Sequence, residues 1–229
     1  MAAPTSSRVQ TASLQIGDRH RVSALIILPP AARACFVFAH GAGAGMNHRF
    51  MEAIATGLGD RTIATLRFQF PYMEAGSGRP DPPAICHATV RAAVAEAARV
   101  APGLPLIAGG RSFGGRMASQ AQASSPLPGV HALAFLGFPL HPAKRPSEDR
   151  AEHLSQVTIP MLFLQGDRDE LAELTLLKSV VARLGSRAML KVIPDADHSY
   201  HVRARSGRKD PQVIVELLDG FVEWLGTVL

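Results

Sequence analysis

Short apolar runs alternate with segments of helical periodicity along most of this chain. Ala34–Ala39 (Ala-Cys-Phe-Val-Phe-Ala) is apolar throughout, which is typical of a strand buried on both faces of a parallel sheet. The same pattern predicts further strands at residues 62–68, 104–108, 130–136, 160–165 and 188–193. Helical spacing of apolar residues predicts helices at 47–58, capped by Asn47, at 84–100, 116–123 and 171–184, and from Pro211 onward. This alternation predicts an α/β fold with a mostly parallel central sheet and helices on both faces.

The segments outside this alternation predict an antiparallel pair, a tail and two loops. Residues 11–16 and 22–28 are β-leaning runs joined by a polar turn, so we expect them to pair antiparallel. Residues 1–10 predict a flexible N-terminal tail. Residues 71–83 and 138–158 predict loops, the second with at most a short helix and no large lid domain. We therefore expect a single domain over residues 11–229.

Composition narrows the class of protein. Apolar residues make up 47% of the chain and charged residues 19%, an ordinary globular mixture. The net charge of +5 comes mostly from scattered arginines. The densest basic run, residues 203–209, is short, so we expect a solvated loop and no nucleic-acid partner.

Cysteine usage and hydropathy exclude further classes. Cys35 and Cys86 lie in apolar or alanine-rich runs, so we expect two buried thiols rather than a disulfide. No metal-ligand spacing appears, and we expect neither a metal nor a cofactor. No stretch approaches 18 apolar residues and residues 1–10 lack an apolar signal core, so we expect a soluble cytoplasmic protein.

The most informative motif lies at the end of the predicted strand 104–108. Gly110-Arg111-Ser112-Phe113-Gly114 matches G-x-S-x-G, in which a serine occupies a sharp strand-to-helix turn and the glycines leave room for crowded backbone. This pattern occurs by chance often enough that it needs supporting context.

That context comes from two later strand ends. Gly166-Asp167-Arg168-Asp169 follows the strand at 160–165, and Asp197-His198-Ser199 follows the strand at 188–193. Because ligands of open α/β sheets bind beyond the carboxyl ends of the strands, we expect these residues to meet Ser112 at one edge. Serine, aspartate and histidine in this chain order predict nucleophilic catalysis by a Ser-His-Asp triad.

These motifs resemble those of small α/β-hydrolases of the dienelactone-hydrolase-like kind, from about residue 34 to the end. The resemblance implies an α/β-hydrolase fold and hydrolysis of a small-molecule ester or thioester. It also implies that Asp169 rather than Asp167 orients His198, because the family's acid turn is G-x-x-D; Asp167 is then expected to cap the turn. The sequence departs from dienelactone hydrolases in carrying serine at Ser112 where they carry cysteine.

Further residues are candidates around the triad. We expect the backbone N–H groups of Phe113 and Ala42 to form an oxyanion hole, Ala42 lying in the His40-Gly41-Ala42-Gly43 loop that resembles the family's oxyanion loop. His40 is interpreted as a structural donor behind this loop or as a substrate contact. For Arg111 and Arg116 we favour pairing with carboxylates over attraction of an anionic substrate. Phe68, Phe70 and Tyr72 are equally consistent with a pocket wall and with the core, and His201 is expected to face solvent.

Three other function classes are weighed against a hydrolase. The glycines at 41–45 do not complete a dinucleotide-binding fingerprint, because Met46 stands at its third glycine and no acid ends the strand at 62–68. Gly110 to Gly115 has P-loop spacing but is followed by Arg116-Met117 instead of lysine and a hydroxyl residue. A non-catalytic binding or scaffold protein of the same fold remains the alternative.

Overall fold

The computed structural model describes residues 9–229, within which eight strands form one sheet in the order β1-β2-β4-β3-β5-β6-β7-β8. Antiparallel pairing joins β1 to β2 and β2 to β4, and the remaining neighbours are parallel. Their bounds are β1 Val9–Ile16, β2 His20–Ile27, β3 Ala34–Ala39, β4 Ile63–Phe68, β5 Leu106–Arg111, β6 Val130–Leu136, β7 Met161–Gly166 and β8 Ala188–Ile193.

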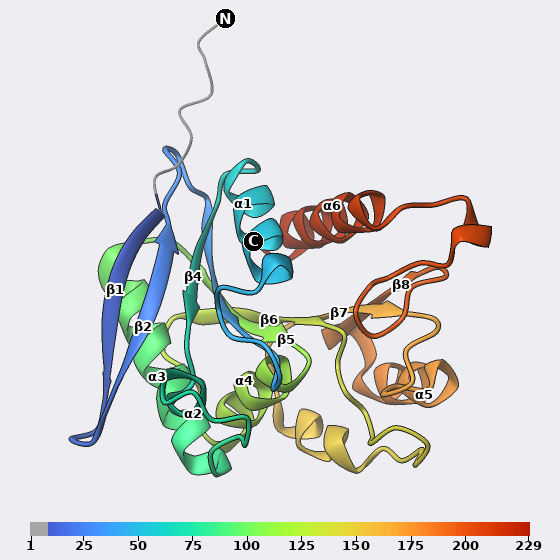
Figure 1. Ribbon diagram of the computed structural model, residues 1–229, viewed down its shortest axis with the longest axis horizontal. Helices are drawn as coiled ribbons and strands as arrows, with labels where there is room; N and C mark the ends of the chain where they lie inside the picture. Colours follow the sequence, from blue (N-terminus) through green and yellow to red (C-terminus); the bar gives the residue numbers. More distant parts are fainter. Residues whose placement is uncertain (1–8) are drawn as a thin grey trace, which may run out of the picture.

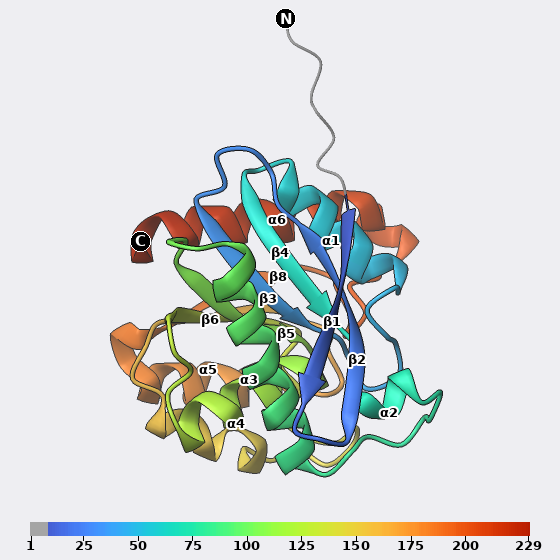
Figure 2. The same ribbon diagram turned by 90° about the vertical axis from the view of Figure 1, so that its left-hand side faces the viewer.

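Helices cover both faces of the sheet, as predicted. Figures 1 and 2 show α1 and α6 on one face and α3, α4 and α5 on the other. The helix bounds are α1 Arg49–Gly59, α2 Pro71–Glu74, α3 Pro83–Val100, α4 Phe113–Ser124, α5 Leu174–Leu184 and α6 Asp210–Val228. Because β3 to β8 run parallel, their carboxyl ends lie at one edge of the sheet, where the loops that follow the strands gather.

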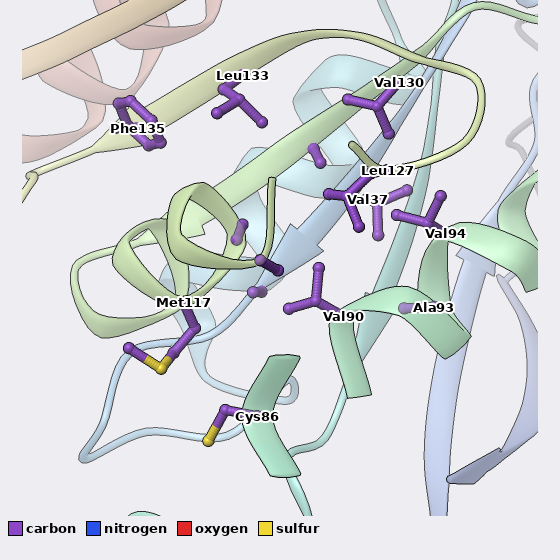
Figure 3. Close-up of a cluster of buried hydrophobic side chains, with 14 of the residues drawn as sticks. Val37, Cys86, Val90, Ala93, Val94, Met117, Leu127, Val130, Leu133 and Phe135 are labelled. Atoms are coloured by element: carbon purple, nitrogen blue, oxygen red, sulfur yellow. The ribbon is translucent and has the colours of Figure 1, made fainter. Parts of the chain in front are cut away.

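Each central strand supplies both hydrophobic cores. Along β3, Cys35 and Val37 belong to the core beneath α3 and α4, whereas Phe36 and Phe38 belong to the core beneath α1 and α6. Figure 3 shows part of the first core, where side chains of α3 and α4 meet those of the sheet. Cys86 lies in it, and both cysteines are free and buried, as predicted. The uninterrupted apolar sequence of β3 follows from this burial on both faces.

The largest departure from the predicted elements surrounds Ser112. The strand predicted to end at residue 108 continues to Arg111, because Gly109 and Gly110 stay extended and pair with β6, Gly110 also lying opposite Ala39 of β3. The helix predicted from Arg116 begins at Phe113. Gly109 and Gly110 therefore belong to the strand, Gly114 and Gly115 belong to the helix, and the chain turns at Ser112.

Smaller departures occur elsewhere. Val9 and Gln10 pair with β2, so that part of the predicted tail is strand; its residues 1–8 lie outside the described range. His48 rather than Asn47 caps α1, its Nδ1 accepting a hydrogen bond from the Phe50 N–H at 3.2 Å. α2 adds one helical turn to the loop predicted at 71–83, and α5 begins at Leu174 instead of residue 171.

The predicted loop at 138–158 contains one short 3₁₀ helix, Asp149–Gln156. Within the described part of the chain, no lid domain is inserted between β6 and β7, in agreement with the prediction. Among the described residues, no inserted domain therefore covers the carboxyl ends of the strands.

A substitution at Phe163 of β7 tests the packing of the core beneath α3 and α4. This side chain is 0% exposed, and its ring centroid lies 4.9 Å from that of Phe135 and 5.7 Å from that of Phe138. We expect Phe163→Ala to lower the free energy of unfolding by about 3–5 kcal/mol, because it leaves a cavity among aromatic rings. Val215→Ala, at a side chain that is 49% exposed, should change it by less than about 0.5 kcal/mol. Urea denaturation measures both, and equal effects would contradict the packing.

Candidate active site

Ser112 lies at the tip of a crowded turn between β5 and α4. Its φ of 50° and ψ of −117° are rare for a residue with a side chain and indicate backbone strain. A Cβ at Gly110 would lie 2.3 Å from the Ala39 carbonyl oxygen, and one at Gly114 would lie 2.5 Å from the His40 carbonyl oxygen. Glycine at these two positions allows the turn to press against the end of β3, as the motif predicts.

The structure brings the three residues of the predicted triad together. Ser112 Oγ lies 2.9 Å from His198 Nε2, and His198 Nδ1 lies 2.7 Å from Asp169 Oδ2. Because a carboxylate accepts from Nδ1–H, Nε2 of the neutral ring is free to accept the serine hydroxyl proton. The side chain of Asp169 is fully buried and that of His198 is 22% exposed, so the series runs from the interior to an accessible serine.

Asp169 is held by contacts that Asp167 lacks. Its Oδ1 accepts the Leu171 N–H at 2.8 Å, and its Oδ2 accepts a hydrogen bond from Gln165 Nε2 as well as from His198. Asp167 is exposed, and its carboxylate makes no hydrogen bond within residues 9–229, so the expectation that it caps the turn is wrong. Asp169 itself caps the turn, in addition to contacting His198.

The loop after β8 is fixed on both sides of His198. Asp197 Oδ1 accepts the N–H groups of Ser199 at 2.8 Å and His201 at 3.0 Å. Tyr200, 2% exposed, donates its hydroxyl to the Leu164 carbonyl at 2.7 Å, and its ring stacks on Phe50 with centroids 5.5 Å apart. His198 is thereby anchored to β7 and to α1. His201 is exposed, as predicted, and pairs with Asp210 at 2.6 Å.

The predicted oxyanion donors occupy adjoining segments. Phe113 is the first residue of α4, and Ala42 lies in the loop after β3, close to the turn that holds Ser112. Neither N–H donates a hydrogen bond to any described residue. The first N–H groups of a helix have no partner inside the helix, which leaves that of Phe113 available to an anion.

His40 supports this loop from the interior. Its Nε2 accepts the Phe70 N–H at 3.0 Å, so its proton lies on Nδ1, which donates to the Gly41 carbonyl at 2.7 Å. Burial lowers its pKa to about 4, although the bond to Gly41 acts in the opposite direction. His40 is therefore neutral and 0% exposed, which agrees with the structural role and excludes the alternative of a substrate contact.

The aromatic candidates belong to the core. Phe68 and Phe70 are 0% exposed and Tyr72 is 3% exposed, so as pocket-lining residues these predictions are wrong. Phe70 and Tyr72 instead pack beneath the partly exposed ring of Phe113. The Tyr72 hydroxyl donates to the Ala42 carbonyl at 2.9 Å and so orients the peptide that follows Ala42.

The prediction that Arg111 and Arg116 pair with carboxylates is also wrong. No described carboxylate lies within ion-pair distance of either guanidinium. Arg111 Nη2 donates to Ser199 Oγ at 3.2 Å, and its Cζ lies 4.7 Å from the centroid of Phe50. Arg116 Cζ lies 5.9 Å from the centroid of Phe113. Burial lowers the pKa of both guanidinium groups.

Sequence analysis missed two glutamines that hold the site together. Gln165, 0% exposed, donates to Asp169, and its Oε1 accepts the Phe138 N–H at 2.8 Å. Gln69 Oε1 accepts the Met46 N–H at 2.8 Å and fixes the loop after β3. For Gln165, the available signal was a polar residue at the end of an otherwise apolar strand. Gln69 follows β4, which itself contains Thr65 and Arg67, so the same signal does not mark it.

Two other site classes find no counterpart among residues 9–229. No cluster of three or more His, Cys, Asp or Glu side chains is arranged to hold a metal ion. None of the helices there is long and apolar enough to cross a membrane.

The fold and this arrangement of serine, histidine and aspartate define the α/β-hydrolase class. The chain belongs to the alpha/beta hydrolase domain family, whose model matches residues 32–226.

Solved structures show the same fold. A dienelactone hydrolase from Anabaena variabilis superposes with a TM-score of 0.79 at 20% identity, covering 98% of this chain and 99% of its own. An α/β serine hydrolase without a lid from Xanthomonas campestris gives 0.72 at 22% identity, covering 97% and 96%. The esterase domain of a Rhodothermus marinus protein gives 0.72 at 17% identity, covering 95% and 97%. The predicted resemblance to dienelactone-hydrolase-like proteins is confirmed at the level of fold.

Gly114 tests the packing of the turn. We expect Gly114→Ala to lower the free energy of unfolding by about 1–3 kcal/mol, because the new Cβ would meet backbone atoms that no rotamer change can move. Gly226→Ala is the matched control: no atom lies within 4 Å of its added Cβ, and alanine at this helical position should stabilise by about 0.5–1 kcal/mol. Chemical denaturation of both variants measures the difference, and equal stability would disprove the close approach.

Proposed function

We propose that this protein is a serine hydrolase that cleaves carboxylic esters or thioesters of small molecules through Ser112, His198 and Asp169. The observation that carries the proposal is the hydrogen-bonded series from Ser112 Oγ through the His198 ring to Asp169. A serine hydroxyl becomes a useful nucleophile only when a base removes its proton, and His198 Nε2 lies at the distance this transfer requires.

In the first half of the reaction, Ser112 Oγ bonds to the substrate carbonyl carbon while its proton passes to His198 Nε2. The carbonyl π electrons move to oxygen and form an oxyanion. When the oxyanion collapses, the bond to the leaving alcohol or thiol breaks, and His198 returns the proton to that group. The products are a Ser112 acyl-enzyme and the released alcohol or thiol.

In the second half, a water molecule attacks the acyl-enzyme and His198 again takes and returns one proton. The carboxylic acid leaves and Ser112 recovers its hydroxyl. Asp169 stays ionised throughout, holds the Nδ1–H tautomer and stabilises the imidazolium each time it forms. Its burial and its bonds to Gln165 and Leu171 favour a fixed orientation for this role.

The N–H groups of Phe113 and Ala42 are the proposed oxyanion donors. Each such donor contributes on the order of 3 kcal/mol of transition-state stabilisation in serine hydrolases. The bonds from His40 to Gly41 and from Tyr72 to Ala42 orient the peptides of this loop before substrate binds.

Small or soluble esters and thioesters fit the proposal better than lipids with long buried chains, because within residues 9–229 no lid encloses the site. The similar structures include an esterase domain and a dienelactone hydrolase, and those names describe those proteins. A non-catalytic scaffold remains the second candidate. A scaffold role does not explain why Ser112 has a strained backbone and a hydroxyl that is hydrogen-bonded to His198.

Variants of the nucleophile and base test the mechanism. Ser112→Ala and His198→Ala should each lower kcat for 4-nitrophenyl butyrate at least on the order of 10³-fold, because either change removes the attacking oxygen or its base. A fluorophosphonate probe should label the wild-type protein and not Ser112→Ala. Unlabelled Ser112 in folded wild-type protein would favour the scaffold, and undiminished turnover by the variants would refute the assignment.

The two aspartates of the acid turn give a matched pair. Asp169→Asn should lower kcat on the order of 10³–10⁴-fold, because an amide does not favour the required histidine tautomer. Asp167→Asn, at an exposed side chain two residues away, should stay within about twofold of wild type. Ester turnover at pH 7.5, checked by circular dichroism for folding, measures both, and the reverse order would place the acid at Asp167.

A further inference from the structure

A cavity of about 490 Å³ lies on the face of the sheet that α1 and α6 cover. It is bordered by the first residues of α1 and α6 and by the loop that follows His198. Two of its lining residues, Arg111 and Ser199, are the chain neighbours of Ser112 and His198. The cavity therefore adjoins the two chain segments that carry the proposed nucleophile and the proposed base.

The guanidinium of Arg111 has unused donors in this cavity. Of its five N–H groups, the structure pairs one with Ser199 Oγ, while the Phe50 ring covers its face. The nearby carboxylates act elsewhere: Asp169 accepts from His198, and Asp197 accepts from the N–H groups of Ser199 and His201. A partly buried cation with free donors attracts an anion strongly, because little water screens it.

The remaining charged side chains around the cavity are one cation and one carboxylate. Arg49 adds a second cation, and the N-termini of α1 and α6 carry partial positive charge. Asp210 is the single carboxylate among the described lining residues. Its oxygens already contact His201 Nδ1 and accept the Val202 N–H. The other walls, including Phe50, Tyr200 and Ile214, are apolar and suit a hydrocarbon chain.

We propose that this cavity binds the carboxylate of an acidic ester, with Arg111 as the residue that determines specificity. The proposal rests on the function assigned above to Ser112. One guanidinium fork matches one carboxylate in charge and geometry, and the apolar walls hold the chain that links this carboxylate to the scissile carbonyl. Esters of dicarboxylic acids, with one free carboxyl group, are the simplest substrates of this kind.

Two substrates of similar size test the preference: mono(4-nitrophenyl) adipate and its methyl ester. In the wild type, kcat/KM should be at least about tenfold higher for the free acid, which gains charged hydrogen bonds at Arg111. Arg111→Met should lower this acid-to-ester ratio by at least about tenfold. Arg33→Met removes the same net charge at an exposed position just before β3 and should leave the ratio within about twofold of the wild type. An equal ratio in the wild type and Arg111→Met overturns the proposal.

A binding measurement separates this proposal from the proposed function. In Ser112→Ala protein, the dissociation constant measured by calorimetry should be at least about tenfold lower for adipate than for neutral adipamide. Adding Arg111→Met should remove this difference. Arg111-dependent binding without ester turnover would leave the anion site intact and refute the esterase. Turnover of both esters with equal binding of adipate and adipamide would refute the anion site alone. If Arg111→Met does not fold, the wild-type ratio and the adipate-to-adipamide comparison still decide.

Discussion

The close backbone contact between the end of β3 and the β5–α4 turn is the constraint on which the site depends. Gly110 and Gly114 approach the carbonyl oxygens of Ala39 and His40 so closely that a side chain at either position would separate the two segments. Backbone atoms on both sides leave no rotamer that relieves the contact. The same packing sets the position of Ser112, of the helix start at Phe113 and of the Ala42 loop. The proposed nucleophile and the proposed oxyanion donors are thus placed by one contact.

Buried polar side chains connect the other loops to this contact. His40 links the loop after β3 to Phe70, and Gln165 links Asp169 to Phe138. A buried polar group without a partner costs several times the net gain of a formed hydrogen bond, so each link disfavours any arrangement in which its two segments separate. Loops that would otherwise be mobile are held by β4, β6 and β7. This is how an edge made of loops keeps Ser112, His198 and Asp169 within hydrogen-bond distance.

The sequence predicted the order of elements and the convergence of Ser112, Asp169 and His198, because both depend on local patterns. Apolar runs locate the strands, and strand ends of a parallel sheet converge, so Ser112, Asp169 and His198 were placed at one edge correctly. It failed where a residue's role depends on a distant partner. The strand was predicted to end at residue 108, although pairing with β3 and β6 keeps Gly109 and Gly110 in it. Phe68 ends a strand and Phe70 follows it, as pocket residues often do, and only the packing against β2 and Phe113 places them in the core.

Charge pairing links the proposed mechanism to the proposed substrate. During acylation the imidazolium of His198 faces the carboxylate of Asp169, and the oxyanion faces the N–H groups of Phe113 and Ala42. Arg111, one residue before Ser112, then remains as a cation without a carboxylate partner among the described residues. In the proposed substrate complex, the free carboxylate of an acidic ester supplies this missing partner, so that the imidazolium, the oxyanion and the guanidinium each face a group of opposite charge or dipole.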